Sequence, residues 1–339
     1  MDAMKITGVR IHHPAGLLRL CTDGELEGWC VGLTPDICRN LVEHMAPVII
    51  DQSPFDRERL WQELARKDRQ RHTALRGFID IALWDLVAKA AAMPVFRYIN
   101  GFRNHCPVYK RGAETSPGQI LEEAQRARNG GYKGYKVATP LPIKTMVPLI
   151  HHLRETVGDD FYLMLDGGGQ LTIADAIKMG RALDETGYYW FDRPRQAIDT
   201  TGGKQVADEL DTPITAEVTT PLEASQVMSM QSADHIKTGT PYSGGITDIL
   251  KIARCAEAFG AFCHLNGPGA CDGFAHGHLL GAIKNSPFFE WTDHDNPSPI
   301  IKNSLQVVEG HIRIPSEPGL GMDIDPDALD DQTAEIIST

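Results

Sequence analysis

The middle of the sequence contains Phe161-Tyr162-Leu163-Met164-Leu165-Asp166, Tyr189-Trp190-Phe191-Asp192 and Ile214-Thr215-Ala216-Glu217, three short apolar runs that each end in an acid. Runs of this length, rich in aromatic and β-branched residues, are typical of buried strands. Stretches with helical periodicity separate them. Alternating strands and helices predict a parallel sheet, and the three acids then lie at the same edge of it.

The same alternation extends in both directions along the chain. We predict eight strands, at Pro107-Val108-Tyr109, Gly134-Tyr135-Lys136-Val137, Phe161–Leu165, Tyr188–Phe191, Pro213–Ala216, His235-Ile236-Lys237, Ala261-Phe262-Cys263 and Phe288-Phe289. Their polar ends fall near residues 110, 136, 166, 192, 217, 238, 264 and 290. Eight strand–helix units close a barrel, so the fold class is α/β, a (β/α)8 TIM-type barrel.

The first hundred residues have a different pattern. Short alternating runs at residues 5–11 and 17–21 predict a small antiparallel sheet, and apolar residues at three- and four-residue spacing predict a helix over residues 77–89. Alternation returns at residues 305–308 and 311–314. We therefore expect the tail to pack back on the N-terminal sheet.

Composition narrows the class of protein. The chain has 339 residues, 42% hydrophobic and 23% charged, which is ordinary for a globular protein. No apolar run approaches the roughly 18–20 residues of a membrane span, and the N-terminus lacks the pattern of a secretory signal. Seven cysteines without CxxC spacing favour reduced thiols. We expect a cytoplasmic protein with no membrane partner.

Charge argues against nucleic acid as a partner. The formal net charge is −12, whereas nucleic-acid binding depends on clustered Lys and Arg. An acidic protein that handles an anion must concentrate positive charge locally, through a few lysines or a bound metal.

The three acids at the strand ends suggest such a metal. Neighbouring strands lie about 4.8 Å apart, so Asp166, Asp192 and Glu217 converge on one volume and would repel one another. Carboxylate oxygens around a hard divalent cation resolve the repulsion, and open positions for water or substrate suit Mg²⁺. The alternative interpretation is that each acid caps the helix that follows its strand. Three acids in successive units favour the metal.

With these features the chain resembles the enolase superfamily, in its mandelate-racemase-like branch, over nearly its whole length. The landmarks are Asp80-Ile81-Ala82-Leu83-Trp84-Asp85 with Lys89, Lys136, Leu163-Met164-Leu165-Asp166, Trp190-Phe191-Asp192-Arg193-Pro194, Glu217, Gly244-Gly245-Ile246-Thr247, His264, Phe289-Glu290-Trp291 and Pro318-Gly319-Leu320-Gly321. No single landmark is decisive, but together they are specific.

The resemblance implies a modified (β/α)8 TIM-type barrel with an N-terminal α+β capping domain over it. We accordingly divide the chain into a capping domain at residues 1–105, a catalytic barrel at 106–300 and a C-terminal segment at 301–339 that packs back on the capping domain. The resemblance also implies Mg²⁺ held by Asp166, Asp192 and Glu217, and a Lys or His base that generates an ene-diolate.

Three departures from the family pattern affect the predicted site. Ala138 stands where the family carries a second strand-2 lysine, and Gly239 stands where many members carry the Asp that orients the strand-7 histidine. Asp192 replaces the usual Glu on strand 4 and shortens that metal ligand by a methylene.

Four side chains remain as candidates for catalysis: Lys136, Lys237, His264 and Glu290. His264 follows an apolar run at the predicted mouth, where function concentrates, although a lone histidine is more often structural. Lys237 lies two residues before Gly239 on the same strand face, but a lysine can also extend to solvent. Glu290 could instead be a buried partner for a lysine.

Two loop residues and two further histidines are also of functional interest. Arg193 and Tyr242 lie in predicted mouth loops, where we expect them to contact substrate. His276 and His278 resemble a metal pair, but they fall inside a helical stretch without a third ligand, which favours a structural role.

The predicted reaction is removal of the proton α to a carboxylate. Racemisation needs bases on both faces, and Ala138 removes the usual one on the strand-2 side. Dehydration needs one base and an acid, which His264 could combine. We therefore expect a hydro-lyase that dehydrates a sugar acid, a small-molecule carboxylate, and works as a homo-oligomer. The alternatives are a racemase, epimerase or cycloisomerase that uses Lys237 and His264 on opposite faces, and a catalytically inactive ligand-binding homologue.

Overall fold

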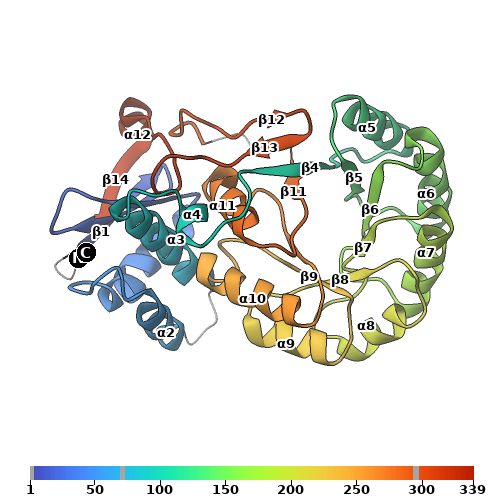
Figure 1. Ribbon diagram of the computed structural model, residues 1–339, viewed down its shortest axis with the longest axis horizontal. Coiled ribbons are helices and arrows are strands. Elements are labelled where there is room, and N and C mark those ends of the chain that lie inside the picture. The colour runs from blue at the N-terminus through green and yellow to red at the C-terminus, as the bar shows by residue number, and fades with distance from the viewer. Residues whose placement is uncertain (1–3, 69–72, 293–297) are drawn as a thin grey trace.

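A ring of parallel strands forms the larger lobe of the computed structural model (Figure 1), which describes residues 4–68, 73–292 and 298–339. All eight predicted strands are present. They are β4 (His105–Arg111), β5 (Gly134–Val137), β6 (Tyr162–Asp166), β7 (Trp190–Asp192), β8 (Ile214–Glu217), β9 (His235–Thr238), β10 (Cys263–Leu265) and β11 (Phe289–Trp291). Pairing runs in sequence order from β10 back to β4, and β11 pairs with β4 in parallel.

Helices follow the first seven of these strands and cover the outside of the ring (Figure 1). They are α5 (Pro117–Asn129), α6 (Ile143–Val157), α7 (Ile173–Thr186), α8 (Thr200–Ala207), α9 (Pro221–Ser229), α10 (Ile246–Ala258) and α11 (Phe274–Ala282). Local sequence sets their limits: Thr172 accepts a hydrogen bond from the Asp175 amide at the start of α7, and Gly187 ends that helix in the left-handed conformation. The last barrel strand leads into the C-terminal tail, so the barrel is a modified one.

The smaller lobe is α+β, as expected. Its four-stranded sheet has the order β14-β1-β2-β3, with β1 (Ile6–Pro14), β2 (Leu17–Thr22), β3 (Gly28–Val31) and β14 (Thr333–Ser338). Its helical elements are α1 (Pro35–Asn40), η1 (Leu41–Met45), η2 (Ala46–Val48), α2 (Arg57–Lys67), α3 (Thr73–Ala90) and α4 (Val95–Tyr98). Helix α3 contains the helix predicted over residues 77–89 and is buried along most of its length.

The C-terminal tail divides between the two lobes. Strand β14, preceded by α12 (Pro326–Gln332), pairs with β1 in the small sheet. The hairpin of β12 (Val307–Val308) and β13 (His311–Arg313) pairs instead with the first half of β4, so these residues do not pack on the N-terminal sheet as expected. The physical reason is that β4 extends below its barrel partners and leaves the backbone of residues 105–107 open to pairing. The three-part domain division stays an interpretation.

The small lobe is joined to the barrel through α3. Asp80 accepts hydrogen bonds from the Thr247 amide (2.9 Å) and hydroxyl (2.6 Å) at the start of α10. A Cβ on Gly77 would lie 2.2 Å from the Pro241 carbonyl oxygen, so the helix can approach this loop only with glycine. The thiols of Cys30 and Cys271, the latter in η3 (Cys271–Gly273), lie 3.6 Å apart across the same junction.

The junction gives a prediction about stability and pH. Burial raises the pKa of Asp80 to about 7, against the opposing effect of its hydrogen bonds from Thr247. The folded state therefore binds this proton more tightly than the unfolded chain does. The resulting stabilisation is complete below the unfolded pKa of about 4 and is lost as the pH rises through about 7.

In the Asp80→Asn variant the side chain stays neutral, so this dependence should disappear. Between about pH 5 and about pH 8, the free energy of unfolding of the wild type should fall by about 3 kcal/mol relative to the variant. Urea denaturation at the two pH values measures the difference. If the free energy of unfolding changed equally with pH in both proteins, the raised pKa of Asp80 would be contradicted.

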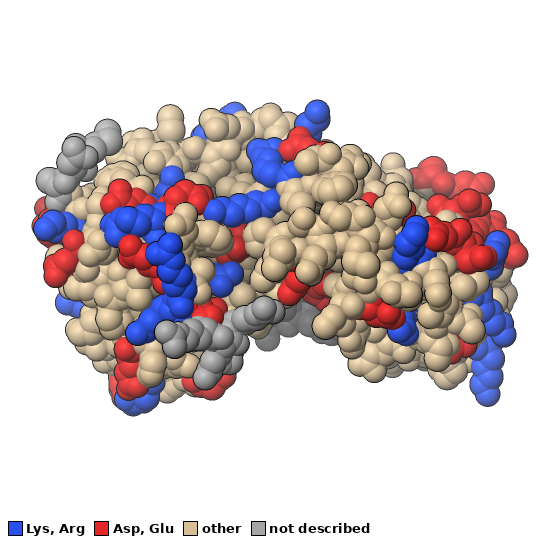
Figure 2. Space-filling view, turned by 90° about the horizontal axis from the view of Figure 1, so that it is seen from below, with Lys and Arg blue, Asp and Glu red and all other residues tan. Residues whose placement is uncertain are grey.

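In the part of the chain that the structure describes, no helix is both long and apolar enough to cross a membrane. Basic and acidic side chains are interspersed over the face shown in Figure 2.

Candidate active site

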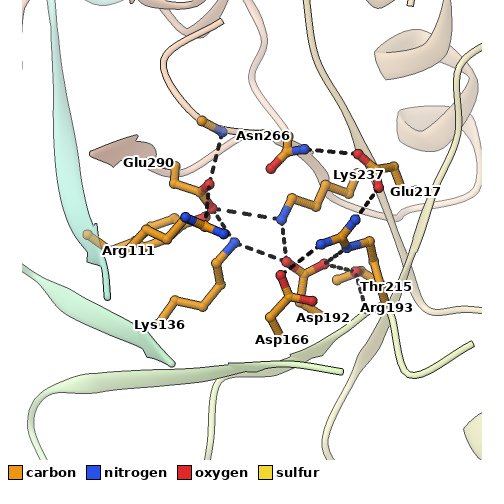
Figure 3. A network of polar contacts seen from close by, with 12 residues as sticks. Arg111, Lys136, Asp166, Asp192, Arg193, Thr215, Glu217, Lys237, Asn266 and Glu290 are labelled. Carbon is orange, nitrogen blue, oxygen red and sulfur yellow. Dashed lines mark hydrogen bonds and ion pairs between the residues drawn. The ribbon is translucent and has the colours of Figure 1, made fainter. Parts of the chain in front are cut away.

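Asp166, Asp192 and Glu217 meet at the carboxyl ends of β6, β7 and β8, as predicted (Figure 3). Asp166 and Asp192 are register partners on adjacent strands, and Glu217 is the register partner of Lys237 on β9. We refer to these three acids as the carboxylate cluster. Parallel pairing thus places all three at one end of the barrel.

Two lysines approach the cluster from the barrel interior. Lys136 on β5 and Lys237 on β9 both contact Oδ2 of Asp192, the former at 3.0 Å. Glu290 on β11 contacts Lys136 and lies 3.8 Å from the Lys237 ammonium. The Lys136 and Asp192 side chains are fully buried, and that of Lys237 is 2% exposed. The structure therefore brings three of the four catalytic candidates together.

Electrostatic interactions keep Lys136, Asp192 and Glu290 ionised. Burial opposes the charge on Lys136, but Glu290 and Asp192 outweigh it and hold the pKa of Lys136 well above its usual range. Burial also opposes the charge on the two acids. Lys237 and Lys136 nevertheless hold the pKa of Asp192 well below normal, and Lys136 and Lys237 lower that of Glu290 to about 2. Lys136 consequently supplies a fixed positive charge.

Arg193 fills the space between the outer acids. Its Nη2 lies 2.8 Å from Asp166 Oδ2, and its Nη1 donates to Glu217 Oε2. The residue has a left-handed backbone (φ 49°), and its amide donates to the carbonyl and hydroxyl oxygens of Thr215, each at 3.2 Å. The present partners of Arg193 are carboxylates, and its expected contact with substrate stays a prediction.

This arrangement does not fit a Mg²⁺ ion in the cluster. The guanidinium occupies the volume between Asp166 and Glu217, and two ammonium groups hold Asp192. Over residues 4–68, 73–292 and 298–339, no group of three or more His, Cys, Asp or Glu side chains has the spacing to hold a metal ion. The assignment of Mg²⁺ to these acids stays a prediction that requires Arg193 to move.

His264 lies apart from the polar network. Strand β10 continues to Leu265, so His264 lies inside the strand as the register partner of Lys237. Its ring stacks on Trp190 with centroids 4.2 Å apart, and its Nε2 is buried without a hydrogen-bond partner in the described structure. Burial holds the pKa of His264 well below its usual value, so the ring is neutral at physiological pH. Its proton-transfer role stays a prediction.

Sequence reasoning missed two members of the site. Asn266 takes the mouth position at the end of β10, and its Nδ2 donates to Glu217 Oε1 at 2.9 Å. Arg111, the last residue of β4, has its Nε 3.9 Å from Glu290 Oε1. The signal available for both was their place at a predicted strand end, and an error of two residues in the β10 boundary hid Asn266.

A cavity of about 300 Å³ opens beside Glu217, between the barrel mouth and the small lobe. Its lining includes Gly32 from the small lobe, Gly239, Tyr242 and Asn266. Tyr242 is 68% exposed and borders the cavity, and its expected contact with substrate stays a prediction. A Cβ on Gly239 would lie 3.2 Å from the Asn266 carbonyl oxygen, so the position that usually carries Asp is confined here.

His276 and His278 are structural in this arrangement. Both are buried in α11. Nε2 of His276 accepts from the Thr240 amide at 2.9 Å, and Nδ1 of His278 accepts from the Phe96 amide at 3.1 Å. Hydrogen bonds to backbone groups account for both rings and support the structural interpretation made from the sequence.

Comparison with known proteins relates both lobes to one group of enzymes. Residues 119–328 match the family model described as enolase C-terminal domain-like, and residues 7–99 match the N-terminal domain of mandelate racemase / muconate lactonizing enzyme. The arabinonate dehydratase of Saccharolobus solfataricus is 27% identical over 95% of this chain and 92% of its own length. The L-talarate/galactarate dehydratase of Salmonella typhimurium is 30% identical over 74% of this chain and 63% of its own length.

Solved structures agree on the fold. L-talarate dehydratase from Polaromonas sp. JS666, crystallised with Mg and L-glucarate, superimposes with a TM-score of 0.86 at 24% identity, and the match covers 99% of both chains. Sugar-acid dehydratases, racemases and cycloisomerases all occur among the similar proteins. The fold is therefore shared, while the chemistry differs from one protein to another.

Proposed function

The chain belongs to the enolase superfamily, in the branch of mandelate racemase and muconate lactonizing enzyme, and on this premise we propose that it dehydrates a sugar acid after removing the proton α to the carboxylate. One observation carries the proposal: four cationic side chains converge on the acids at the barrel mouth, and one of these acids, Glu217, lines the cavity. The four cations are Arg111, Lys136, Arg193 and Lys237.

A site rich in positive charge suits this reaction, because the C–H bond next to a carboxylate is only weakly acidic. Loss of the α-proton creates a second negative charge on the substrate, so the site must stabilise the ene-diolate more than the ground state. Fixed positive groups that surround the carboxylate before the reaction supply this stabilisation. Lys136, which is buried and held cationic, fits that role.

We assign proton transfer to Lys237. It shares Asp192 Oδ2 with Lys136 and is the register partner of Glu217, which borders the cavity. Lys237 pairs as an ammonium with Asp192 at rest, so it must first give up a proton to solvent. The neutral amine then takes the substrate proton as the Cα–H bond breaks. It then returns the proton to the β-hydroxyl as the Cβ–O bond breaks, so that one water leaves. The resulting enol tautomerises to a 2-oxo-3-deoxy acid.

A screen of aldonic and aldaric acids tests the proposal. Incubation in D₂O followed by mass spectrometry and NMR should identify an acid that loses one water and gives a 2-oxo-3-deoxy product. The Lys237→Met variant should lose this activity. Lys204, which is 43% exposed and pairs with Asp208 on α8, is the matched control, and its replacement by Met should not alter the rate.

The same screen distinguishes the rival functions. Deuterium incorporation at Cα without loss of water would indicate a racemase, epimerase or cycloisomerase. That outcome has one observation in its favour, because Lys136 and Lys237 reach the same Asp192 oxygen from different strands. Neither exchange nor dehydration with any acid would contradict catalysis and favour a ligand-binding homologue.

A further inference from the structure

We propose that Arg193 is the resident cation of the carboxylate cluster. Its guanidinium takes the place that the sequence resemblance assigns to Mg²⁺, so the site is assembled and charged without a divalent ion. The inference concerns the cation alone and holds whichever acid is the substrate.

The first argument is position. Arg193 spans the cluster: one terminal nitrogen lies 2.8 Å from Asp166, the other donates to Glu217, and Nε lies 4.0 Å from Asp192 Oδ1. A planar guanidinium with its fixed fork of donors is well suited to bind two carboxylates on different sides at once. The group therefore does for these acids what a bridging metal ion would do.

The second argument is hydrogen bonding. Every oxygen atom of the carboxylate cluster already accepts from a protein donor. The donors are the Gly168 amide and Arg193 on Asp166, the Thr215 hydroxyl, Lys136 and Lys237 on Asp192, and Asn266 and Arg193 on Glu217. A Mg²⁺ ion demands near-octahedral oxygen ligands at short distance, and it would have to displace several of these donors.

The third argument is charge. The network consists of four cationic and four anionic side chains, so it is neutral without a metal. The cations are Arg111, Lys136, Arg193 and Lys237, and the anions are Asp166, Asp192, Glu217 and Glu290. Adding a divalent ion would leave two surplus positive charges next to Lys136 and Asp192, which are fully buried, and unpaired charge is costly there.

The fourth argument is that the backbone directs Arg193 inward. Its left-handed conformation is uncommon for a residue with a long side chain. The Thr215 oxygens accept from its amide, and the Gly169 amide donates to its carbonyl at 2.7 Å. A Cβ on Gly167 would lie 3.0 Å from that carbonyl oxygen, so glycine permits the close approach of the two turns.

Metal binding tests the inference directly, without reference to activity. Titration of the full-length wild type with Mn²⁺, followed by electron paramagnetic resonance and calorimetry, should show no stoichiometric site. Arg193→Asn keeps a residue that tolerates the left-handed backbone and removes the cation. This variant should bind one Mn²⁺ at least about 100-fold more tightly than the wild type, because three acids are then left without their central charge.

Thermal unfolding gives a second readout. Chelator and Mg²⁺ should leave the Tm of the wild type unchanged. Without metal, Arg193→Asn should have a lower Tm than the wild type, and saturating Mg²⁺ should raise it by about 5 °C or more.

Two control variants locate the effect. Arg195→Asn makes the same change two residues further on, where the arginine pairs with Asp199 outside the cluster, and it should not create a metal site. Adding Asp166→Asn to Arg193→Asn should abolish the acquired binding.

Stoichiometric Mn²⁺ binding by the wild type, with an affinity comparable to that of Arg193→Asn, would overturn the inference. If Arg193→Asn does not fold, the wild-type titration alone decides: a bound ion refutes the resident cation, and no bound ion supports it. The result is independent of the dehydration screen. A wild type that binds metal could still dehydrate a sugar acid, and an inactive chain could still exclude metal.

Discussion

Replacing Asp192 with Asn is expected to lower the free energy of unfolding by about 3–5 kcal/mol and to abolish turnover, because it removes one partner from a buried ion-pair network. Asp192 is fully buried and receives both Lys136 and Lys237. After the substitution, the nearest acid to the Lys237 ammonium is Glu290, at 3.8 Å. Urea denaturation measures the stability, and the product assay of the best acid from the screen measures the turnover.

Asp208 provides the control for this substitution. It pairs with Lys204 one turn away on α8, and its side chain is 59% exposed. Exposed pairs of this kind contribute little, so Asp208→Asn should cost at most about 0.5 kcal/mol and leave turnover intact. If Asp192→Asn loses as little stability as the control, the two buried lysines do not depend on this carboxylate as the partner of their charge.

The barrel could be predicted from the sequence because its strands are short apolar runs with regular spacing. Each run closes on a polar residue, and parallel neighbours necessarily end at one edge. The tail could be predicted only in part. Alternation at residues 307–308 and 311–313 identifies strands but not their partner, and the open backbone at the start of β4 that receives them is a property of the assembled barrel.

The convergence of Asp166, Asp192 and Glu217 was predictable for the same reason, whereas the role of Arg193 was not. The direction of a loop side chain depends on the backbone conformation of the loop, which is left-handed at Arg193. This conformation is held by hydrogen bonds of Arg193 with Thr215 and Gly169. Both residues are more than 20 positions away in the sequence, so the hydrophobic pattern around Arg193 does not reveal these contacts. The positions of charged residues along a strand therefore do not show that Arg193, the residue after Asp192, pairs with Asp166 and Glu217.

The position of His264 illustrates how a small boundary error changes a functional assignment. Residues at the mouth and residues one layer below differ by two positions along a strand. The strand runs past His264 to Leu265, so Asn266 reaches Glu217 while the histidine ring stacks on Trp190 beneath it. Proton transfer can therefore be assigned to Lys237 or to His264, and matched variants separate the two.

Lys237→Met is expected to reduce turnover and α-proton exchange by about 10²–10⁴, the usual size of a general acid–base contribution. Lys136 still pairs with Asp192 in this variant, so the network keeps one of its two lysines there. His264→Asn should change both rates by less than about 10-fold, because its ring stacks on Trp190 in the layer below the mouth, where burial disfavours the imidazolium form that a proton-transferring histidine has to adopt. Deuterium exchange at Cα, measured by NMR alongside product formation, reports the step directly. The reverse result, with turnover lost in His264→Asn and kept in Lys237→Met, would return proton transfer to the histidine and leave the barrel and the ion-pair network as described.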